Sequence, residues 1–376
     1  MKNQLLPEGF RDSLPELALK EDKINSIFIQ LMQKNGFVLV KPPLLEFEST
    51  LFFLLNNNEE SDSFRVLDPI SQKMMGLRTD ITVQIARISS GSLIDLPRPL
   101  KICYCGDILK VNNTNLNLSR QAIQIGSEII GTKNNNCESE IIGLISETLK
   151  SLKIKNFFFN FTMPTLISSI EKDFSLSNTQ LNLIKQKFKN KNPTDLEKIS
   201  NKLKEISDNL IDSVGSAREK LKQLKQIKFT KFVQKEINTF IKIVQKITIN
   251  FPDIEVYIDP LEIDDSDYHT GVAFKVFSEN LKELFRGGNY KVSEENCIGF
   301  SGFTESLVNE SLLKFSPQKK IYVPINIEIN EKKNLQNKGF VTLQALNLQS
   351  KNKMINEAKK HQCNFYFFDK HIYKLD

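Results

Sequence analysis

The sequence predicts an α+β fold in which an antiparallel sheet is flanked by helices, a helical insertion interrupts the strands, and a short α/β segment closes the chain. Three observations support this fold class. Two alternating apolar runs, 102–111 and 121–130, flank the polar loop 112–119, which is typical of an antiparallel hairpin. The stretch from about 166 to 249 is polar and helix-patterned. About 60 residues follow Phe315, which is near the lower limit for an independent domain.

The N-terminal part is expected to form a helix followed by a strand. Apolar residues three and four positions apart mark one face of the helix: Ile24, Ile27, Phe28 and Leu31. Gly36 ends this helix, and the apolar run 37–40 starts a strand that Pro42-Pro43 closes.

The hairpin carries a small polar pocket. Successive side chains of a strand point to opposite faces. One face therefore holds Gln124, Gly126 and Glu128 on the second strand and Tyr104, Gly106, Ile108 and Lys110 on the first. A carboxylate and an amide beside a glycine can bind a small polar ligand.

Further along the chain, the Phe-rich stretch 156–161 is predicted to be core and not a stacking platform for bases. Strands resume after the insertion near 254–257 and continue through Phe303 to a final helix. Gly287-Gly288 is expected in a tight turn between strands.

The expected domains are residues 1–313, including the insertion at about 166–249, and a short C-terminal α/β domain at 314–376.

Composition excludes several classes of protein. The 376 residues carry a net charge of +6, but the lysines between Lys185 and Lys246 alternate with acidic residues at helical spacing, which favours solvated helix faces over a nucleic-acid surface. Five cysteines without a C-x-x-C pair indicate neither a metal site nor a disulfide framework, and no cofactor is expected. No run reaches the roughly 20 apolar residues of a membrane helix, and the start has no apolar signal-peptide core. We expect a cytoplasmic protein.

Several segments resemble, in family order, the motifs of class II aminoacyl-tRNA synthetases and their histidyl branch. The hairpin and its Gln124-x-Gly126-x-Glu128 ending are similar to motif 2. The other matching segments are 6–12 and 42–46 (entry and motif 1), 77–82 (L-R-P-[DE]-x-T turn), 266–274 (histidine loop), 285–290 (G-G-R-Y-D segment) and 299–305 (motif 3). The resemblance covers roughly the first 310 residues. It implies a class II synthetase-like antiparallel sheet and a dimer formed through the motif 1 region.

The positions that handle ATP depart from that family. Lys110 occupies the place of the motif 2 arginine, and Asn112 that of the acidic residue two positions on. Asp264 replaces the arginine at the start of the histidine loop, and Ser306 replaces the motif 3 arginine. Arginine offers phosphate a bidentate fork, lysine offers only a point charge, and aspartate would repel a polyphosphate. We therefore expect no aminoacylation.

The amino-acid pocket of the histidyl enzymes is nevertheless retained. Matched residue by residue, the positions that hold free histidine in that family are here Asp80, Thr82, Gln124, Glu128 and Tyr268. His269 replaces a second tyrosine, and Asp264 shares a face with Tyr268 if the loop is extended. The cation for the ligand's carboxylate is expected to be Lys110 or Arg120.

Simpler interpretations exist for single residues of this pocket. Asp80 alone predicts an N-cap for a helix from Ile81 to about Ser89. Glu128 alone would be a surface carboxylate on a strand, and a lone histidine such as His269 is usually structural. The ligand interpretation depends on the matched segments in which these residues lie.

The tail resembles a particular non-catalytic group of synthetase-like proteins, the regulatory subunits of ATP phosphoribosyltransferase. Its V-P, L-x-x-x-G-[WF] and E-A-[RK]-x-x-x-C patterns are matched at 321–324, 335–340 and 357–363. That resemblance implies a subunit of a hetero-oligomer in histidine biosynthesis. It would bind and activate a short-form catalytic subunit and transmit allosteric inhibition by histidine.

A second function, from a different class, stays open. The chain could be a divergent histidyl-tRNA synthetase-like enzyme or an ATP-dependent histidine ligase. Histidine-dependent exchange of pyrophosphate into ATP separates the two hypotheses, because only an enzyme that forms the adenylate catalyses this exchange.

Overall fold

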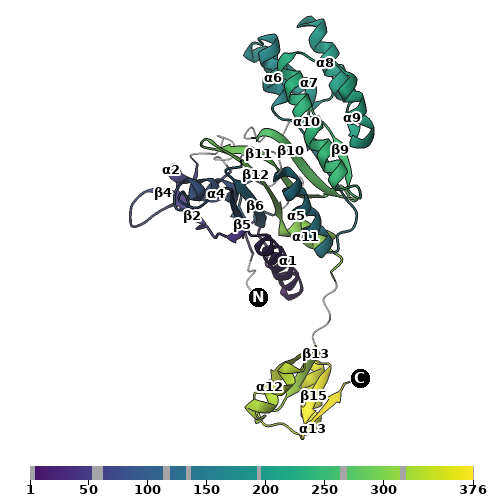
Figure 1. The fold of residues 1–376 in the computed structure, drawn as a ribbon. Helices are drawn as coiled ribbons and strands as arrows, with labels where there is room; N and C mark the ends of the chain where they lie inside the picture. Colours follow the sequence, from purple (N-terminus) through teal and green to yellow (C-terminus); the bar gives the residue numbers. More distant parts are fainter. Residues whose placement is uncertain are drawn as a thin grey trace. The chain divides into compact units, whose positions relative to one another are not determined.

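The structure is a computed structural model, and it describes residues 5–52, 62–112, 119–132, 137–192, 196–262, 269–313 and 319–375. The chain forms two compact units, Met1–Leu313 and Lys314–Asp376 (Figure 1).

A nine-stranded sheet forms the centre of the first unit, in the order β1-β5-β6-β12-β11-β10-β7-β9-β8. Its strands are β1 (Val38–Leu39), β5 (Leu100–Leu109), β6 (Gln121–Ile130), β7 (Phe157–Thr162), β8 (Gly215–Ser216), β9 (Glu255–Ile258), β10 (His269–Ser278), β11 (Glu283–Val292) and β12 (Glu295–Phe303). Neighbouring strands are antiparallel except for β1 with β5 and β7 with β9. The predicted α+β class, an antiparallel sheet flanked by helices, is confirmed.

Two hydrophobic clusters cover opposite faces of this sheet. On one face, α1 (Pro15–Lys34), α5 (Cys137–Ser151) and α11 (Thr304–Glu310) pack over strand residues such as Cys103 and Ile125. On the other face, α4 (Ile81–Ser90) packs over Ile102 and Tyr104. The period of two along β5 thus sends alternate side chains to different helices.

The local predictions for the N-terminal part and the hairpin are confirmed. Helix α1 ends at Lys34, and Gly36 adopts φ +83°, a left-handed conformation that glycine accepts without strain. Strands β5 and β6 form the expected antiparallel hairpin. Phe159 and Phe161 of β7 are fully buried in the core.

The prediction of a tight turn at Gly287-Gly288 is wrong, because both residues lie inside β11. A Cβ on Gly287 would overlap the Gly299 carbonyl oxygen of β12. A Cβ on Gly288 would lie 2.7 Å from both the Ala273 Cα of β10 and the His269 ring. These glycines therefore permit a close approach within the sheet, a use that a diglycine in a sequence does not distinguish from a turn.

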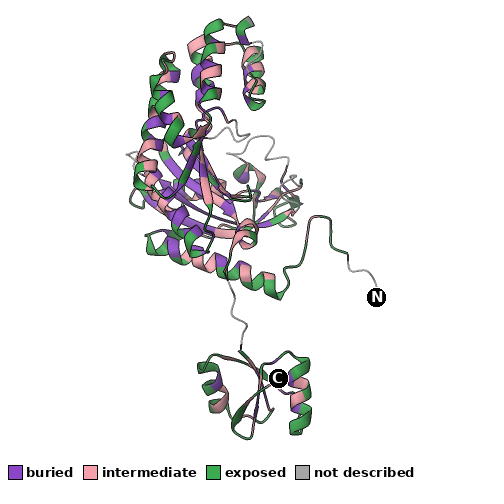
Figure 2. Cartoon of the chain, turned by 90° about the vertical axis from the view of Figure 1, so that its right-hand side faces the viewer, coloured by how far each residue is buried: buried purple, intermediate pink, exposed green. Residues whose placement is uncertain are grey.

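The stretch between β7 and β9 is mainly helical. It contains α6 (Leu166–Phe174), α7 (Asn178–Lys189), a 3-10 turn (Leu196–Lys198), α8 (Asn201–Asp212), β8, α9 (Ala217–Gln226) and α10 (Lys231–Asn250). Figure 1 shows these helices gathered together beside β9 and β10. In Figure 2 they alternate buried and exposed faces, as solvated amphipathic helices do.

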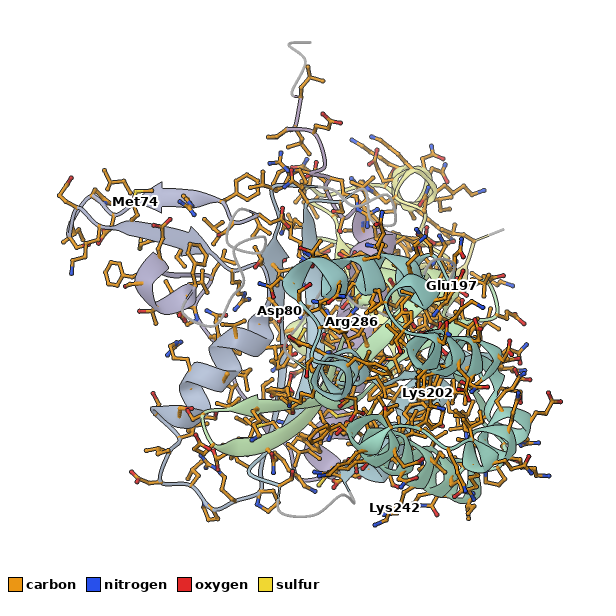
Figure 3. All side chains as sticks on the ribbon, turned by 90° about the horizontal axis from the view of Figure 1, so that it is seen from above. Met74, Asp80, Glu197, Lys202, Lys242 and Arg286 are labelled. Carbon is orange, nitrogen blue, oxygen red and sulfur yellow. The ribbon has the colours of Figure 1, made fainter. Side chains whose placement is uncertain are left out.

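A small sheet, β2-β4-β3, precedes the hairpin. It consists of β2 (Leu45–Phe47), β3 (Arg65–Leu67) and β4 (Met74–Leu77), with α2 (Glu48–Leu51) packed on it. Figure 3 shows Met74 on this sheet, away from the insertion that carries Lys202 and Lys242.

The second unit is a small α/β fold with the strand order β14-β13-β15-β16. Its elements are β13 (Lys319–Val323), α12 (Ile329–Asn337), β14 (Phe340–Gln344), α13 (Lys351–Lys360), β15 (Phe365–Phe368) and β16 (His371–Lys374). Strands β14, β13 and β15 are parallel, and β16 is antiparallel to β15. None of the helices in the described part of the chain combines the length and apolar character needed to cross a membrane.

Candidate functional site

The centre of the candidate site is Glu128, on the face of the sheet that α4 covers. Its side chain is 2% exposed. One carboxylate oxygen accepts a hydrogen bond from the Tyr104 hydroxyl at 3.2 Å, and the other accepts one from the Tyr290 hydroxyl at 2.8 Å. Burial, together with a smaller effect of the nearby Asp80 carboxylate, raises the pKa of Glu128 to about 8. Glu128 is therefore not the surface carboxylate that its sequence context alone would suggest.

Glycines of the sheet make room for this group. A Cβ on Gly299 of β12, directly opposite Glu128, would overlap the carboxylate. A Cβ on Gly126 would overlap the Tyr104 hydroxyl. The glycine of the Gln124-x-Gly126-x-Glu128 pattern thus has a steric basis, because a side chain at position 126 would collide with the Tyr104 hydroxyl.

Asp80 and Gln124 connect this pocket to the start of α4. Asp80 Oδ1 accepts from the Thr82 amide at 2.6 Å and from Gln124 Nε2 at 3.1 Å, while Gln124 Oε1 accepts from the Ile81 amide at 2.8 Å. The N-cap interpretation of Asp80 is confirmed. Thr82 Oγ1 lies 2.9 Å from the Tyr104 hydroxyl, so one network links the helix start to Glu128.

Replacing Asp80 tests the structural half of this network. Asp80→Ala is expected to lower the free energy of unfolding by about 1 to 2 kcal/mol, because it removes the cap and leaves the buried Gln124 amide without that acceptor. Asp80→Asn should lose less, since its amide oxygen can still cap the helix. Urea denaturation measures both changes.

Ser200→Ala is a matched control, because Ser200 precedes α8 without a side-chain capping bond. Equal losses for Asp80→Ala and Ser200→Ala would contradict the capping role.

Lys110 and Arg120 lie at the loop end of the hairpin, directly after β5 and directly before β6, and Arg120 is eight residues from Glu128 along the chain. The Lys110 amide donates to the Arg120 carbonyl at 2.8 Å. The Arg120 guanidinium lies over the rings of Phe10 and Phe64, at 5.4 and 4.6 Å from their centroids, which gives it a cation–π role in packing. That either residue binds a ligand's carboxylate stays a prediction.

A second group of polar residues lies on the same face, next to His269 at the start of β10. They line a small hollow together with His269 and consist of Thr162, Glu262, Lys275 and Arg286. Lys275 Nζ lies 2.8 Å from Glu262 Oε1, and Asn160 Nδ2 donates to the other oxygen of Glu262 at 2.8 Å. Arg286 forms an ion pair with Glu283. Lys275 and Arg286 are thus two further cations on the sheet face that carries Glu128.

Sequence reasoning missed Lys275 and Arg286. Lys275 directly follows the matched segment 266–274, and Arg286 is the second residue of the matched segment 285–290. What brings these two residues to the site is the strand register. It pairs Lys275 of β10 with Arg286 of β11, and it sets Arg286 opposite Ser301 of β12.

Other predicted positions are only partly accounted for. Asp264 and Tyr268 lie outside the described residues. Ser306 is a partly buried residue of α11. Across the described ranges, no cluster of three or more His, Cys, Asp or Glu side chains could hold a metal ion.

Comparison with known proteins identifies the family. The family model for histidyl-tRNA synthetase matches residues 9–307. An ATP phosphoribosyltransferase regulatory subunit of Paramagnetospirillum magneticum is 30% identical, with 96% of this chain and 94% of the relative covered. The chain belongs to the histidyl-tRNA synthetase family, in its ATP phosphoribosyltransferase regulatory-subunit branch. The resemblance on which the sequence analysis depended is confirmed.

Further comparisons agree with this placement. A regulatory subunit of the same name from Gluconobacter oxydans is 30% identical over 91% of this chain and 90% of its own length. A solved structure from Bacillus halodurans, described as an ATP phosphoribosyltransferase regulatory subunit/histidyl-tRNA synthetase, superposes with a TM-score of 0.81 at 20% identity, covering 95% of this chain and 97% of that one. Histidyl-tRNA synthetase from Nostoc gives 0.74 at 19% identity, covering 97% and 91%. At these identities the two structures support the fold.

Proposed function

We propose that this chain is the non-catalytic regulatory subunit of ATP phosphoribosyltransferase, which catalyses the first step of histidine biosynthesis. It binds and activates a short-form catalytic subunit, and histidine bound beside Glu128 reverses the activation. The observation that carries the histidine part is the buried Glu128 carboxylate, held between two tyrosine hydroxyls in a pocket of polar side chains. The names of the relatives support the regulatory part.

The pocket suits a small cationic amino acid. The ionised Glu128 carboxylate would pair with an ammonium or imidazolium group, and a charge pair is strong where water is excluded. The Tyr104 and Tyr290 hydroxyls can rotate to share the carboxylate with such a ligand. Lys275 and Arg286 join Lys110 and Arg120 as candidates for the ligand's carboxylate.

The same site is poorly suited to forming an adenylate. That chemistry requires preorganised positive charge on the phosphates. In this chain the matched positions carry Lys110, Asn112, Asp264 and Ser306. The alternative enzyme reading therefore lacks the bidentate cations that the reaction uses in the synthetases it resembles.

The dimer expected through the motif 1 region belongs to this proposal. Strand β1 is one edge of the large sheet, and its Val38 is 48% exposed. Leu45 and Phe47 of β2 are 37% and 39% exposed. Apolar side chains exposed at a sheet edge are typical of an interaction surface.

A reconstitution experiment tests the function. Titrating this chain into the short-form catalytic subunit from the same genome is expected to raise phosphoribosyl-ATP formation. Histidine should then lower that rate by about 5- to 150-fold, the range of ordinary allosteric coupling energies of about 1 to 3 kcal/mol. Glu128→Gln should keep the activation and lose the response to histidine.

Two outcomes would contradict the proposal. One is that no complex forms and the catalytic subunit is not activated. The other is a histidine-dependent exchange of pyrophosphate into ATP that Glu128→Ala abolishes, which would instead support a divergent synthetase-like enzyme or ligase.

A further inference from the structure

In the second unit, the first strand, β13, lies between the two strands that follow it in the chain, β14 and β15. The sheet order β14-β13-β15 means that the chain leaves β13 through α12 to one neighbour, then crosses through α13 to the other. The helices pack on opposite faces. Leu335 of α12 meets Ile321 and Val323, whereas Met354 of α13 lies in the cluster of Tyr322. The loops after β13 and β14 therefore diverge, and such a switch point opens a crevice at the carboxyl ends of parallel strands.

The structure has a hollow at this place. Its volume is about 380 Å3, within the roughly 300 to 1,000 Å3 of small-molecule sites. It is lined by the segments that leave all three parallel strands: 324–328 after β13, 345–349 after β14, and 367–370 at the end of β15. Hydrogen bonds fix the first two segments to each other, because Gln344 Nε2 donates to the Ile325 carbonyl and the Ala345 amide donates to the Val323 carbonyl.

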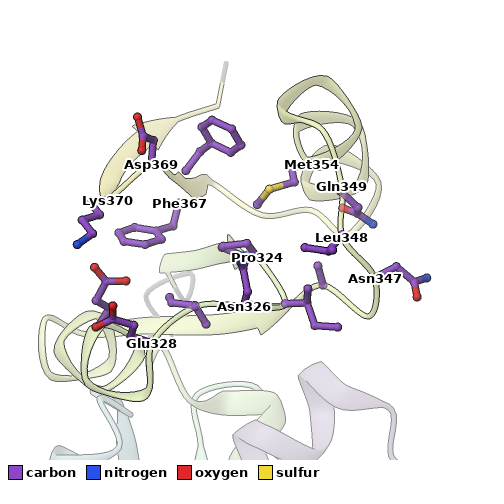
Figure 4. A pocket seen from close by; sticks show the side chains of 15 residues that line it. Pro324, Asn326, Glu328, Asn347, Leu348, Gln349, Met354, Phe367, Asp369 and Lys370 are labelled. Carbon is purple, nitrogen blue, oxygen red and sulfur yellow. The ribbon is translucent and has the colours of Figure 1, made fainter.

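The charges of the lining select the kind of ligand. Three carboxylates line the hollow: Glu328 and Glu331 come from the start of α12, and Asp369 comes from the β15–β16 turn. Lys370 is the only cation among the lining residues. Figure 4 shows Lys370 and Glu328 on the same side of the hollow. The excess of negative charge disfavours phosphates and nucleotides.

Apolar side chains form the rest of the lining. Phe367 and Met354 are buried at its floor, while Ile325 and Leu348 are 39% and 78% exposed at its rim. Amide side chains of Asn326, Asn347 and Gln349 supply neutral hydrogen-bonding groups. A bare metal ion would gain nothing from the apolar side chains. An organic cation can pair with the carboxylates and also pack against the apolar side chains.

We propose that this hollow binds a small organic cation, an amine or guanidinium on a short apolar body, at the carboxyl edge of the β14-β13-β15 sheet. The charged group lies near Glu328, Glu331 and Asp369, and the body covers Phe367 and Leu348. This site is separate from the Glu128 pocket, and the inference does not depend on the proposed regulatory function.

Calorimetric titration of the full chain with agmatine tests the site. Agmatine carries a guanidinium and an amine on a short hydrocarbon chain. It is expected to bind wild type, while succinate, a dianion of similar length, does not. The double variant Glu328→Gln/Glu331→Gln should bind agmatine about tenfold more weakly, since two charge contacts near the surface are lost. Lys370→Gln should bind it about two- to threefold more tightly, because a competing internal cation is removed.

Two further variants separate this site from other effects. Glu357→Gln removes a carboxylate from α13 outside the hollow and should leave agmatine binding unchanged. Glu128→Gln should also leave agmatine binding unchanged while it abolishes histidine binding. Absence of agmatine binding at millimolar concentration would overturn the proposal. So would equal affinity in wild type and the Glu328→Gln/Glu331→Gln variant, or loss of agmatine binding in Glu128→Gln.

Discussion

Histidine is expected to bind this chain about fifty-fold more tightly at pH 8 than at pH 6, if its affinity follows the ionisation of Glu128. The pKa of Glu128 is raised to about 8, chiefly by burial. Below that pH the carboxyl carries a proton and cannot pair with a cationic ligand. Affinity should thus fall about tenfold per pH unit well below 8 and level off above it. Calorimetric titration with histidine across this range measures the change.

The ligand titrates as well, so a control variant is needed. The imidazole of free histidine loses its proton near the lower end of the range. Glu128→Gln keeps the size of the side chain but cannot ionise, so its weak residual affinity should follow only the ligand's own titration. The ratio of wild-type to variant affinity then isolates Glu128. A ratio that does not change between pH 6 and 8 would show that Glu128 is already ionised or does not contact the ligand.

Local patterns were sufficient to predict the elements that frame the site. Period-two alternation of apolar residues located the β5–β6 hairpin. Gly36, followed by a continuous apolar run, located the end of α1. Gly287-Gly288 was misassigned because a turn and a close approach between strands call for the same residue. Only the register of β10, β11 and β12 reveals what lies opposite each glycine.

The candidate site was predictable where its residues share one strand or one turn. Gln124 and Glu128 share a face of β6. Asp80 caps α4, the helix that directly follows it, as its residue type suggested. The contact between Tyr290 and Glu128 could not be predicted in the same way, because 162 positions separate the two residues and β12 lies between their strands. Partners of this kind depend on the order of strands, which period and spacing do not encode.

Gly299→Ala is expected to destabilise the first unit by about 2 to 3 kcal/mol, because its Cβ would overlap the buried Glu128 carboxylate. The carboxylate is held from both sides by Tyr104 and Tyr290, so it cannot move aside without breaking those hydrogen bonds. The Gly299→Ala variant should also lose histidine binding, because its Glu128 carboxylate is displaced. Urea denaturation measures the first effect, and calorimetric titration with histidine the second.

The cause of the Gly299→Ala loss can be isolated with a double-mutant cycle. In a Glu128→Ala background the new Cβ meets mainly the Ser127 carbonyl oxygen, at 2.8 Å. Gly299→Ala should therefore be less harmful there, with a coupling energy of about 1 to 2 kcal/mol between the two sites. Gly143→Ala in α5 is the matched control, since its Cβ would lie 3.5 Å from the Phe251 ring, an ordinary contact, and alanine favours a helix. Equal losses from Gly299→Ala in both backgrounds would attribute the strain to the backbone and remove the steric reason for a glycine opposite Glu128.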